Sequence, residues 1–328
     1  MERIPLACEK ISLISPGELD TSLDFSSKLN PFKTKDQELL LQGLERSGIL
    51  SPILSIKKTG NPNPLVIDGF KRIKWALSSK IDTVCVITLP QMEEEELVVF
   101  LTTKYAPTLD TCVVRALFLY FLVEKSFKHK TIVEKVMPIL GLEPHKGLLE
   151  RYLKIAGLPH KLLLFCHEKD FSLKRCINLS YKPRRLLETI IGLNGVISLS
   201  ASLLQELCDN IHDILRRDDM DVEAFFELKQ VRDILGMEKD PSTKTRLLRR
   251  FVWQMRYPVL SSVHAQIEEI EKRHFSNMPF CIKWDRSLEN RKITITGSVS
   301  SPNELDSLID ALSDKGTKEG INKMLARF

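Results

Sequence analysis

The first hundred residues alternate between short apolar runs and helical patterns. Leu65–Ile67 is an apolar run that ends in Asp68-Gly69, which predicts a strand closed by a turn. Ile73, Ala76 and Leu77 then recur three and four positions apart, so a helix is expected directly after this turn, with these three residues on its buried face. The same reading predicts further strands at 11–14, 49–56 and 84–87 and further helices at 40–47 and 93–101.

The middle of the chain is predicted to be helical. Residues 110–125 form one long apolar pattern, 131–142 form a shorter helix ending at Gly141, and 146–155 form a second helix. A turn at 143–145 joins the last two. Two short helices around such a turn have the order of a helix-turn-helix.

The second helix of this pair carries residue types that contact DNA. Leu148, Leu149, Leu153 and Ile155 are expected to pack inward, while Lys146, Arg151, Tyr152 and Lys154 are expected to project outward. Arg and Lys can reach guanine edges, and Lys and Tyr can contact phosphates. We therefore predict a recognition helix here, although many helix pairs share this pattern without binding DNA.

The last third predicts packed helices followed by a small mixed unit. Residues 186–275 show amphipathic helical spacing but no motif that carries a chemistry. Alternating runs at 280–284 and 292–297 predict a hairpin, and Ser301-Pro302-Asn303-Glu304 is a capping box that opens a helix over 305–313. Such a unit is too small to bury a core alone, so we expect a homodimer through it; packing on its own chain is the alternative.

Composition places the chain among cytoplasmic globular proteins. Its 328 residues, 43% hydrophobic and 28% charged, are enough for two to four domains. We find no apolar run long enough for a membrane span and no signal-peptide pattern, and we expect no membrane association. The seven cysteines are scattered without a CxxC pair, which predicts reduced thiols and no metal site.

Charge is concentrated in the middle of the chain. The net charge is +5, but residues 125–185 contain 14 Lys and Arg against 5 Asp and Glu. This segment therefore carries +9 and the remainder −4. A basic middle between acidic flanks is typical of a nucleic-acid-binding segment.

The turn at Gly69 suggests a phosphate site. Glycine lets the backbone approach a ligand, and the helix that follows offers unpaired N–H groups. Lys71, Arg72 and Lys74 add three cations where the helix dipole already favours an anion. A solvated basic helix start is the alternative, and the pattern alone leaves both open.

The order of these segments resembles a known family. The runs "GILSPILSI", "PLVIDGFKRIKWA" and "VCVITLP" resemble the N-terminal domain of the ParB partition proteins, which bind CTP. The resemblance implies a CTP site, with Mg²⁺. The predicted nucleotide-binding residues are Gly48, Pro52, Gly69, Lys71, Arg72 and Lys74. Sulfiredoxin shares this fold but needs a cysteine after the glycine, and Phe70 in that position excludes its thiol chemistry.

The resemblance continues into the basic segment. The run "YLKIAGLPHKLLLFCHEKDFSLKRCINL" is similar to the segment that follows the recognition helix in ParB proteins. It implies double-stranded DNA as a partner, contacted by Lys174 and Arg175 in addition to the recognition helix. It further implies a nucleoid-associated role in chromosome or plasmid partition or in transcription control, and a partition ATPase as a further partner.

One stretch departs from the family. Residues 102–110 correspond to the E-N-x-x-R motif that completes the nucleotide site, and neither the Glu-Asn pair nor the Arg is present. The departure argues against CTP hydrolysis. Two alternatives stay open, namely a nucleotide hydrolase or phosphotransferase of the same fold, and a partner-binding adaptor in which both sites have decayed.

The sequence thus predicts an α+β protein in four parts. These are a mixed α/β ParB/sulfiredoxin-like domain at 1–106 and an all-α helix-turn-helix domain at 107–185. A helical domain of unknown role follows at 186–276, and a hairpin-plus-helix unit at 277–328.

Overall fold

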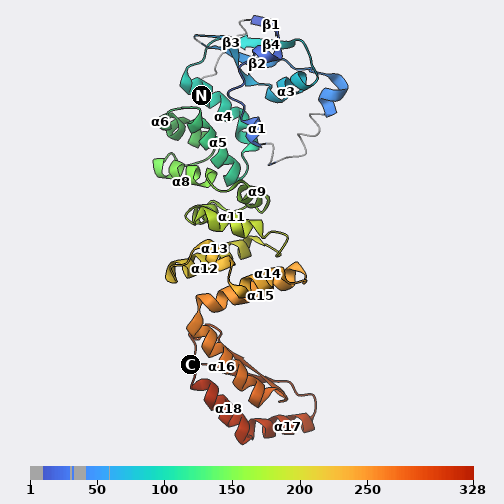
Figure 1. Cartoon of the computed structure of the whole chain (residues 1–328), viewed down its shortest axis with the longest axis vertical. Coiled ribbons are helices and arrows are strands. Elements are labelled where there is room, and N and C mark those ends of the chain that lie inside the picture. The colour runs from blue at the N-terminus through green and yellow to red at the C-terminus, as the bar shows by residue number, and fades with distance from the viewer. Residues whose placement is uncertain (1–9, 30–31, 33–41, 59) are drawn as a thin grey trace. The chain divides into compact units, whose positions relative to one another are not determined.

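The computed structural model describes residues 10–29, 32, 42–58 and 60–328 (Figure 1). The chain forms two compact units, Met1–Gly192 and Leu193–Phe328. The division into four parts, with boundaries after residues 106, 185 and 276, stays a prediction.

The first unit begins with a four-stranded mixed sheet in the order β1-β4-β2-β3. β1 (Lys10–Ile14) pairs antiparallel with β4 (Val84–Leu89), and β4 runs parallel to β2 (Ile53–Lys58). β2 turns back antiparallel into β3 (Asn61–Asp68). All four strands overlap the predicted apolar runs, although β2 begins at Ile53 instead of residue 49 and β3 begins at Asn61 instead of residue 65.

Two helices follow strands of this sheet. α3 (Phe70–Ser78) begins directly after β3 and buries Phe70, Ile73 and Ala76, as its spacing predicted in part. The expectation that Leu77 shares this buried face is wrong, because its side chain is 53% exposed. α4 (Glu94–Tyr105) follows β4 and extends four residues past its predicted end. Of the helix predicted at 40–47, residues 42–47 are helical, and 40–41 lie outside the described residues.

The rest of the first unit is helical. α5 (Cys112–Glu124) is a strongly apolar helix whose inward residues are almost completely buried. α8 (Lys146–Ala156) packs against it and against α10 (Leu173–Ser180). The other helical segments are η1 (Pro16–Glu18), α1 (Ser26–Leu29), η3 (Ala106–Thr108), α6 (His129–Thr131), η4 (Ile132–Val136, a π turn), α7 (Met137–Ile139), α9 (His160–Glu168) and α11 (Arg184–Gly192).

The second unit opens with packed helices, as its amphipathic spacing predicted. They are α12 (Ala201–Arg217), α13 (Val222–Phe226), α14 (Lys229–Gly236), α15 (Pro241–Arg256) and α16 (Pro258–Phe275). The predicted hairpin follows as β5 (Phe280–Trp284) and β6 (Ile293–Gly297), paired antiparallel. α17 (Pro302–Ser313) begins at the predicted cap, where Ser301 Oγ accepts a hydrogen bond from the N–H of Glu304.

A final helix was not predicted. α18 (Lys315–Leu325) packs against α16, and a Cβ at Gly320 would stand 2.5 Å from Cζ of Phe275. Met324 therefore joins an apolar cluster with Ile267, Phe280 and Trp284. This cluster gives the C-terminal segment a core of its own, built from α16, the hairpin and α18.

The architecture is the predicted α+β class, a small mixed sheet with helices at the N-terminus and an antiparallel strand pair near the C-terminus. In the described parts of the chain, no helix combines the length and the apolar character needed to cross a membrane.

Candidate functional site

A cavity of about 670 Å³ lies where β3 ends and α3 begins. Its walls combine apolar side chains, four hydroxyl groups and a small set of charges. The apolar residues include Leu29, Leu54 and Phe70, the hydroxyls are those of Ser26, Ser51, Tyr105 and Thr108, and the charged residues are Asp68, Lys71, Arg72 and Lys104. A planar apolar group and an anionic group could both be accommodated in such a site.

Gly69 shapes one wall of this cavity. Its φ is +102°, in the left-handed region that residues with a Cβ rarely adopt. A Cβ at this position would also stand 2.6 Å from Cδ1 of Ile53. Both constraints require glycine, and the turn that it makes brings the first turn of α3 to the cavity.

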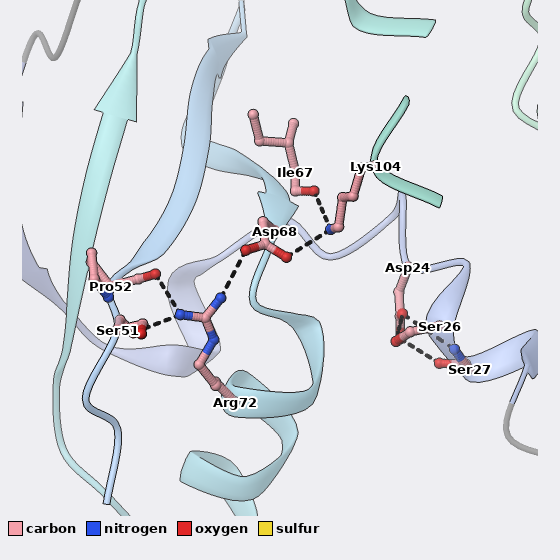
Figure 2. A network of polar contacts seen from close by, with 9 residues as sticks. All are labelled: Asp24, Ser26, Ser27, Ser51, Pro52, Ile67, Asp68, Arg72 and Lys104. Carbon is pink, nitrogen blue, oxygen red and sulfur yellow. Dashed lines mark hydrogen bonds and ion pairs between the residues drawn. The ribbon is translucent and has the colours of Figure 1, made fainter. Parts of the chain in front are cut away.

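Asp68 lies between two cations at the end of β3 (Figure 2). Its Oδ2 accepts a hydrogen bond from Nη2 of Arg72 at 2.8 Å, and its Oδ1 lies 2.8 Å from Nζ of Lys104. Nη1 of Arg72 also donates to the carbonyl oxygens of Ser51 and Pro52, both at 2.7 Å. Arg72 therefore fastens the loop before β2 to the start of α3.

Lys104 reaches this network from α4. Its Nζ donates to the carbonyl oxygen of Ile67 at 2.6 Å and lies 5.0 Å from the ring centre of Phe70. Burial lowers the pKa of Lys104, and Asp68 opposes that effect. Burial by itself would raise the pKa of Asp68, but the hydrogen bond and charge of Lys104 and the charge of Arg72 bring it below its ordinary value. Asp68 is thus an ionised carboxylate at physiological pH.

The structure brings together four of the six predicted nucleotide-binding residues. Pro52, Gly69, Lys71 and Arg72 line the cavity. Gly48 instead ends the preceding helix, with φ of +68° and its N–H bonded to the carbonyl of Leu44. Lys74 forms an ion pair with Asp24, its Nζ 2.7 Å from Oδ2, outside the cavity wall.

The sequence reasoning missed Lys104. It lies in the stretch 102–110, which was compared with the family motif and found to lack the expected residues. A signal was present in the sequence, because the apolar residues Val98, Leu101 and Tyr105 recur at helical spacing, and all three are buried on α4. Extending the helix would have placed Lys104 on α4 rather than in a linker.

The helix pair predicted to bind DNA is present. A continuous helical stretch from α6 to α7 is followed by a turn, in which Gly141 has φ of +67°, and then by α8. Lys146, Arg151 and Lys154 are exposed on α8, and Lys174 and Arg175 are exposed on α10. Nζ of Lys154 lies 4.5 Å from the ring centre of Tyr181, which is itself exposed. Within the described parts of the chain, Arg151 has no hydrogen-bond or ion-pair partner.

The prediction that Tyr152 projects outward is wrong. Its side chain is only 2% exposed and lies on the inward face of α8 with Leu149 and Ile155. Burial raises the pKa of its hydroxyl, and the charge of Arg115 opposes that effect. Residues 149, 152 and 155 recur every three positions, so Tyr152 shares the face of the two aliphatic residues.

The C-terminal segment exposes an apolar face. No residue of α17 is buried, and Leu305 and Ile309 are 45% and 51% exposed. Leu308, Ala311 and Leu312 pack partly on the cluster around Trp284. The helix therefore covers this cluster with part of its apolar residues and leaves Leu305 and Ile309 largely in solvent.

Comparisons with known proteins give a likeness of fold. No protein-family model matches the sequence, and no curated protein matches it either. Two solved structures of C-terminally truncated ParB from Caulobacter crescentus are similar, one complexed to the centromeric parS site and one with CTP-γ-S. The first has 15% identity and a TM-score of 0.32, and the match covers 60% of this chain and 98% of that one. The second has 14% identity and a TM-score of 0.24, with 56% and 96% covered.

A third solved structure, a Pnob8-like ParB-N domain, has 14% identity and a TM-score of 0.32. Its match covers 74% of this chain and 97% of that chain. Identities and TM-scores this low describe a ParB-like fold and carry no argument about what the present chain binds.

Proposed function

We propose that this protein binds double-stranded DNA through the helix pair formed by α6–α7 and α8. The observation that carries the proposal is the outward face of α8, where Lys146, Arg151 and Lys154 are exposed within a segment of net charge +9. A helix of this length fits the major groove, and its Arg and Lys side chains supply donors for base edges and phosphates. A role in partition or in nucleoid or transcription control follows from the resemblance to ParB proteins.

The test compares two double variants of the full chain. Arg151→Ala with Lys154→Ala should weaken binding to DNA and reduce the slope of its salt dependence by about 2. Lys229→Ala with Arg232→Ala is the matched control, because these exposed cations also lie three residues apart on a helix, α14. Gel retardation at several salt concentrations measures both. Equal DNA affinity of the parent and the first variant would show that these residues of α8 do not contact DNA.

We further propose that the cavity at Gly69 binds a nucleotide, with CTP as the ligand that the resemblance implies. Its volume, apolar walls and cations Lys71, Arg72 and Lys104 support this role. Among the described residues, Asp68 is the only carboxylate on the cavity wall, and it is engaged with two cations. A metal would therefore be held chiefly by the ligand's phosphates, which is the usual mode for Mg²⁺.

Turnover is not expected at this site. A hydrolase needs a base to activate water, and Asp68 has its pKa lowered and its oxygens occupied. Calorimetry with the four nucleoside triphosphates tests binding. Lys71→Ala should lower the affinity for the nucleotide. Lys74→Ala should leave it unchanged, because Lys74 lies outside the cavity wall. Nucleotide hydrolysis that persists in the Arg72→Ala variant would contradict the assignment of the nucleotide site to this cavity.

We also propose a homodimer through α17 and the hairpin. The support is the exposed apolar face of α17, because a helix without a buried residue gains stability by covering that face. Leu305→Glu with Ile309→Glu places charges on the exposed half and spares the core. Sedimentation of the full chain should then show a monomer in place of a dimer. A monomeric parent at micromolar concentration would contradict the proposal.

A further inference from the structure

The charges in the cavity are arranged differently from those of a simple anion site. Such a site presents its cations to the ligand. Here the carboxylate of Asp68 stands in the wall of the cavity with both oxygens directed at cations, Arg72 on one side and Lys104 on the other (Figure 2). Its side chain is 36% exposed, so its charge also faces any ligand that enters.

The two cations differ in how firmly they are held. Arg72 is 15% exposed and is fixed by three acceptors, which include two backbone carbonyl oxygens. Lys104 is 22% exposed and has two acceptors among the described residues, Asp68 and the single backbone carbonyl oxygen of Ile67. A flexible lysine can exchange one anionic partner for another. A guanidinium held by three acceptors cannot do so without breaking its hydrogen bonds to the loop before β2. Lys104 is therefore the cation that a ligand could recruit.

We propose that Asp68 is a built-in counter-anion that competes with the phosphates of a bound nucleotide for Lys104 and thereby limits the affinity of the cavity. This inference rests on the proposed nucleotide role of the same cavity. A phosphate that approaches Lys104 must displace Asp68 and also lie close to its negative charge. The penalty grows with the charge of the ligand, so a triphosphate loses more affinity than a monophosphate.

The experiment compares CTP with CMP on the full chain, by calorimetry in the absence of Mg²⁺. Asp68→Asn keeps the size of the side chain and one acceptor oxygen for Lys104, but removes the charge. It should bind CTP about tenfold more tightly than the parent does and CMP only about twofold to threefold more tightly. Asp82→Asn, which removes an exposed carboxylate elsewhere in the same unit, should leave both affinities at the parent value.

Two further variants test the role of Lys104 and provide a second neutral replacement for Asp68. Adding Lys104→Met to Asp68→Asn should abolish the gain, because the recruited cation is then missing. Asp68→Ser, which is also neutral, replaces Asp68→Asn if that variant does not fold, as judged by circular dichroism.

The outcomes separate this inference from the function on which it rests. If the parent binds CTP and the folded neutral variants bind it no better, Asp68 serves only to fix Arg72, and the inference is overturned while the nucleotide role stands. If neither the parent nor the neutral variants bind any nucleotide, both are overturned. A gain that persists with Lys104→Met would also overturn the competition for Lys104.

Discussion

The cavity at Gly69 and the outward face of α8 use the same residue types in opposite ways. In the cavity, Arg72 and Lys104 point at Asp68 and at backbone carbonyl oxygens of their own chain. On α8, Arg151 and Lys154 extend into solvent, and Lys154 lies over the ring of Tyr181. Both regions are basic in sequence. On α8 Lys146 lies 3.9 Å from a carboxylate oxygen of the exposed Glu150, but among the described residues no ion pair holds Arg151 or Lys154.

The difference shows how burial decides what a cation does. A partly buried guanidinium must be paired, because leaving its charge uncompensated costs several kcal/mol, and it then becomes part of the scaffold. An exposed cation has no such need and keeps its donors for a phosphate. A count of Lys and Arg along the chain does not separate these cases, and the following variants do.

The largest effect is expected on the inward face of α8. Tyr152→Ala removes a buried aromatic side chain and should lower the free energy of unfolding by about 4 kcal/mol. Tyr152→Phe keeps the ring and loses only the hydroxyl group, so about 1 kcal/mol is expected, with DNA affinity unchanged. Denaturant unfolding and gel retardation measure the two quantities. A loss of DNA affinity in the Phe variant as large as that of Arg151→Ala would place Tyr152 in the interface.

A smaller effect separates the two classes of arginine. Arg72→Ala leaves Asp68 with one cation fewer and two carbonyl oxygens without their donor, so the free energy of unfolding should fall by about 3 kcal/mol. Arg151→Ala should change it by less than about 0.5 kcal/mol, because the side chain is exposed and unpaired in the described chain. Similar costs for the two variants would mean that the contrast between scaffold and surface does not hold.

The sequence carried more information about the elements than about the site. The alternation at 280–284 and the cap at Ser301 predicted the hairpin and α17, because both signals are local. The start of α3 was equally local, since glycine was required at one position. The error at Leu77 came from treating three apolar residues as one face without knowing which side the sheet would cover.

The site needed contacts between distant segments. Lys104 meets Asp68 across 36 residues of sequence, and Arg72 meets Ser51 across 21. No local pattern records such pairs. The cations near Gly69 were assigned to phosphate, although Lys74 pairs with the distant Asp24 and Arg72 pairs with Asp68, four positions earlier in the sequence. The acidic residues that neutralise them, Asp24 and Asp68, are the part of the site that charge counting left out.

The smallest effect tests the charge of Asp68 directly. Its pKa lies below the ordinary 3.8, so the ionised carboxylate stabilises the folded state at neutral pH, and this contribution is lost as the pH falls from about 4 through the folded pKa. Because the group is a third exposed, less than about 1 kcal/mol is expected. The stability difference between the parent and Asp68→Asn should therefore shrink between pH 5 and about pH 3, as measured by urea unfolding. The difference between the parent and Arg151→Ala should not change over this range, since Arg151 has no carboxylate partner among the described residues. A difference for Asp68→Asn that grows on acidification would mean that the folded state raises the pKa of Asp68, and the two cations would then not be its partners.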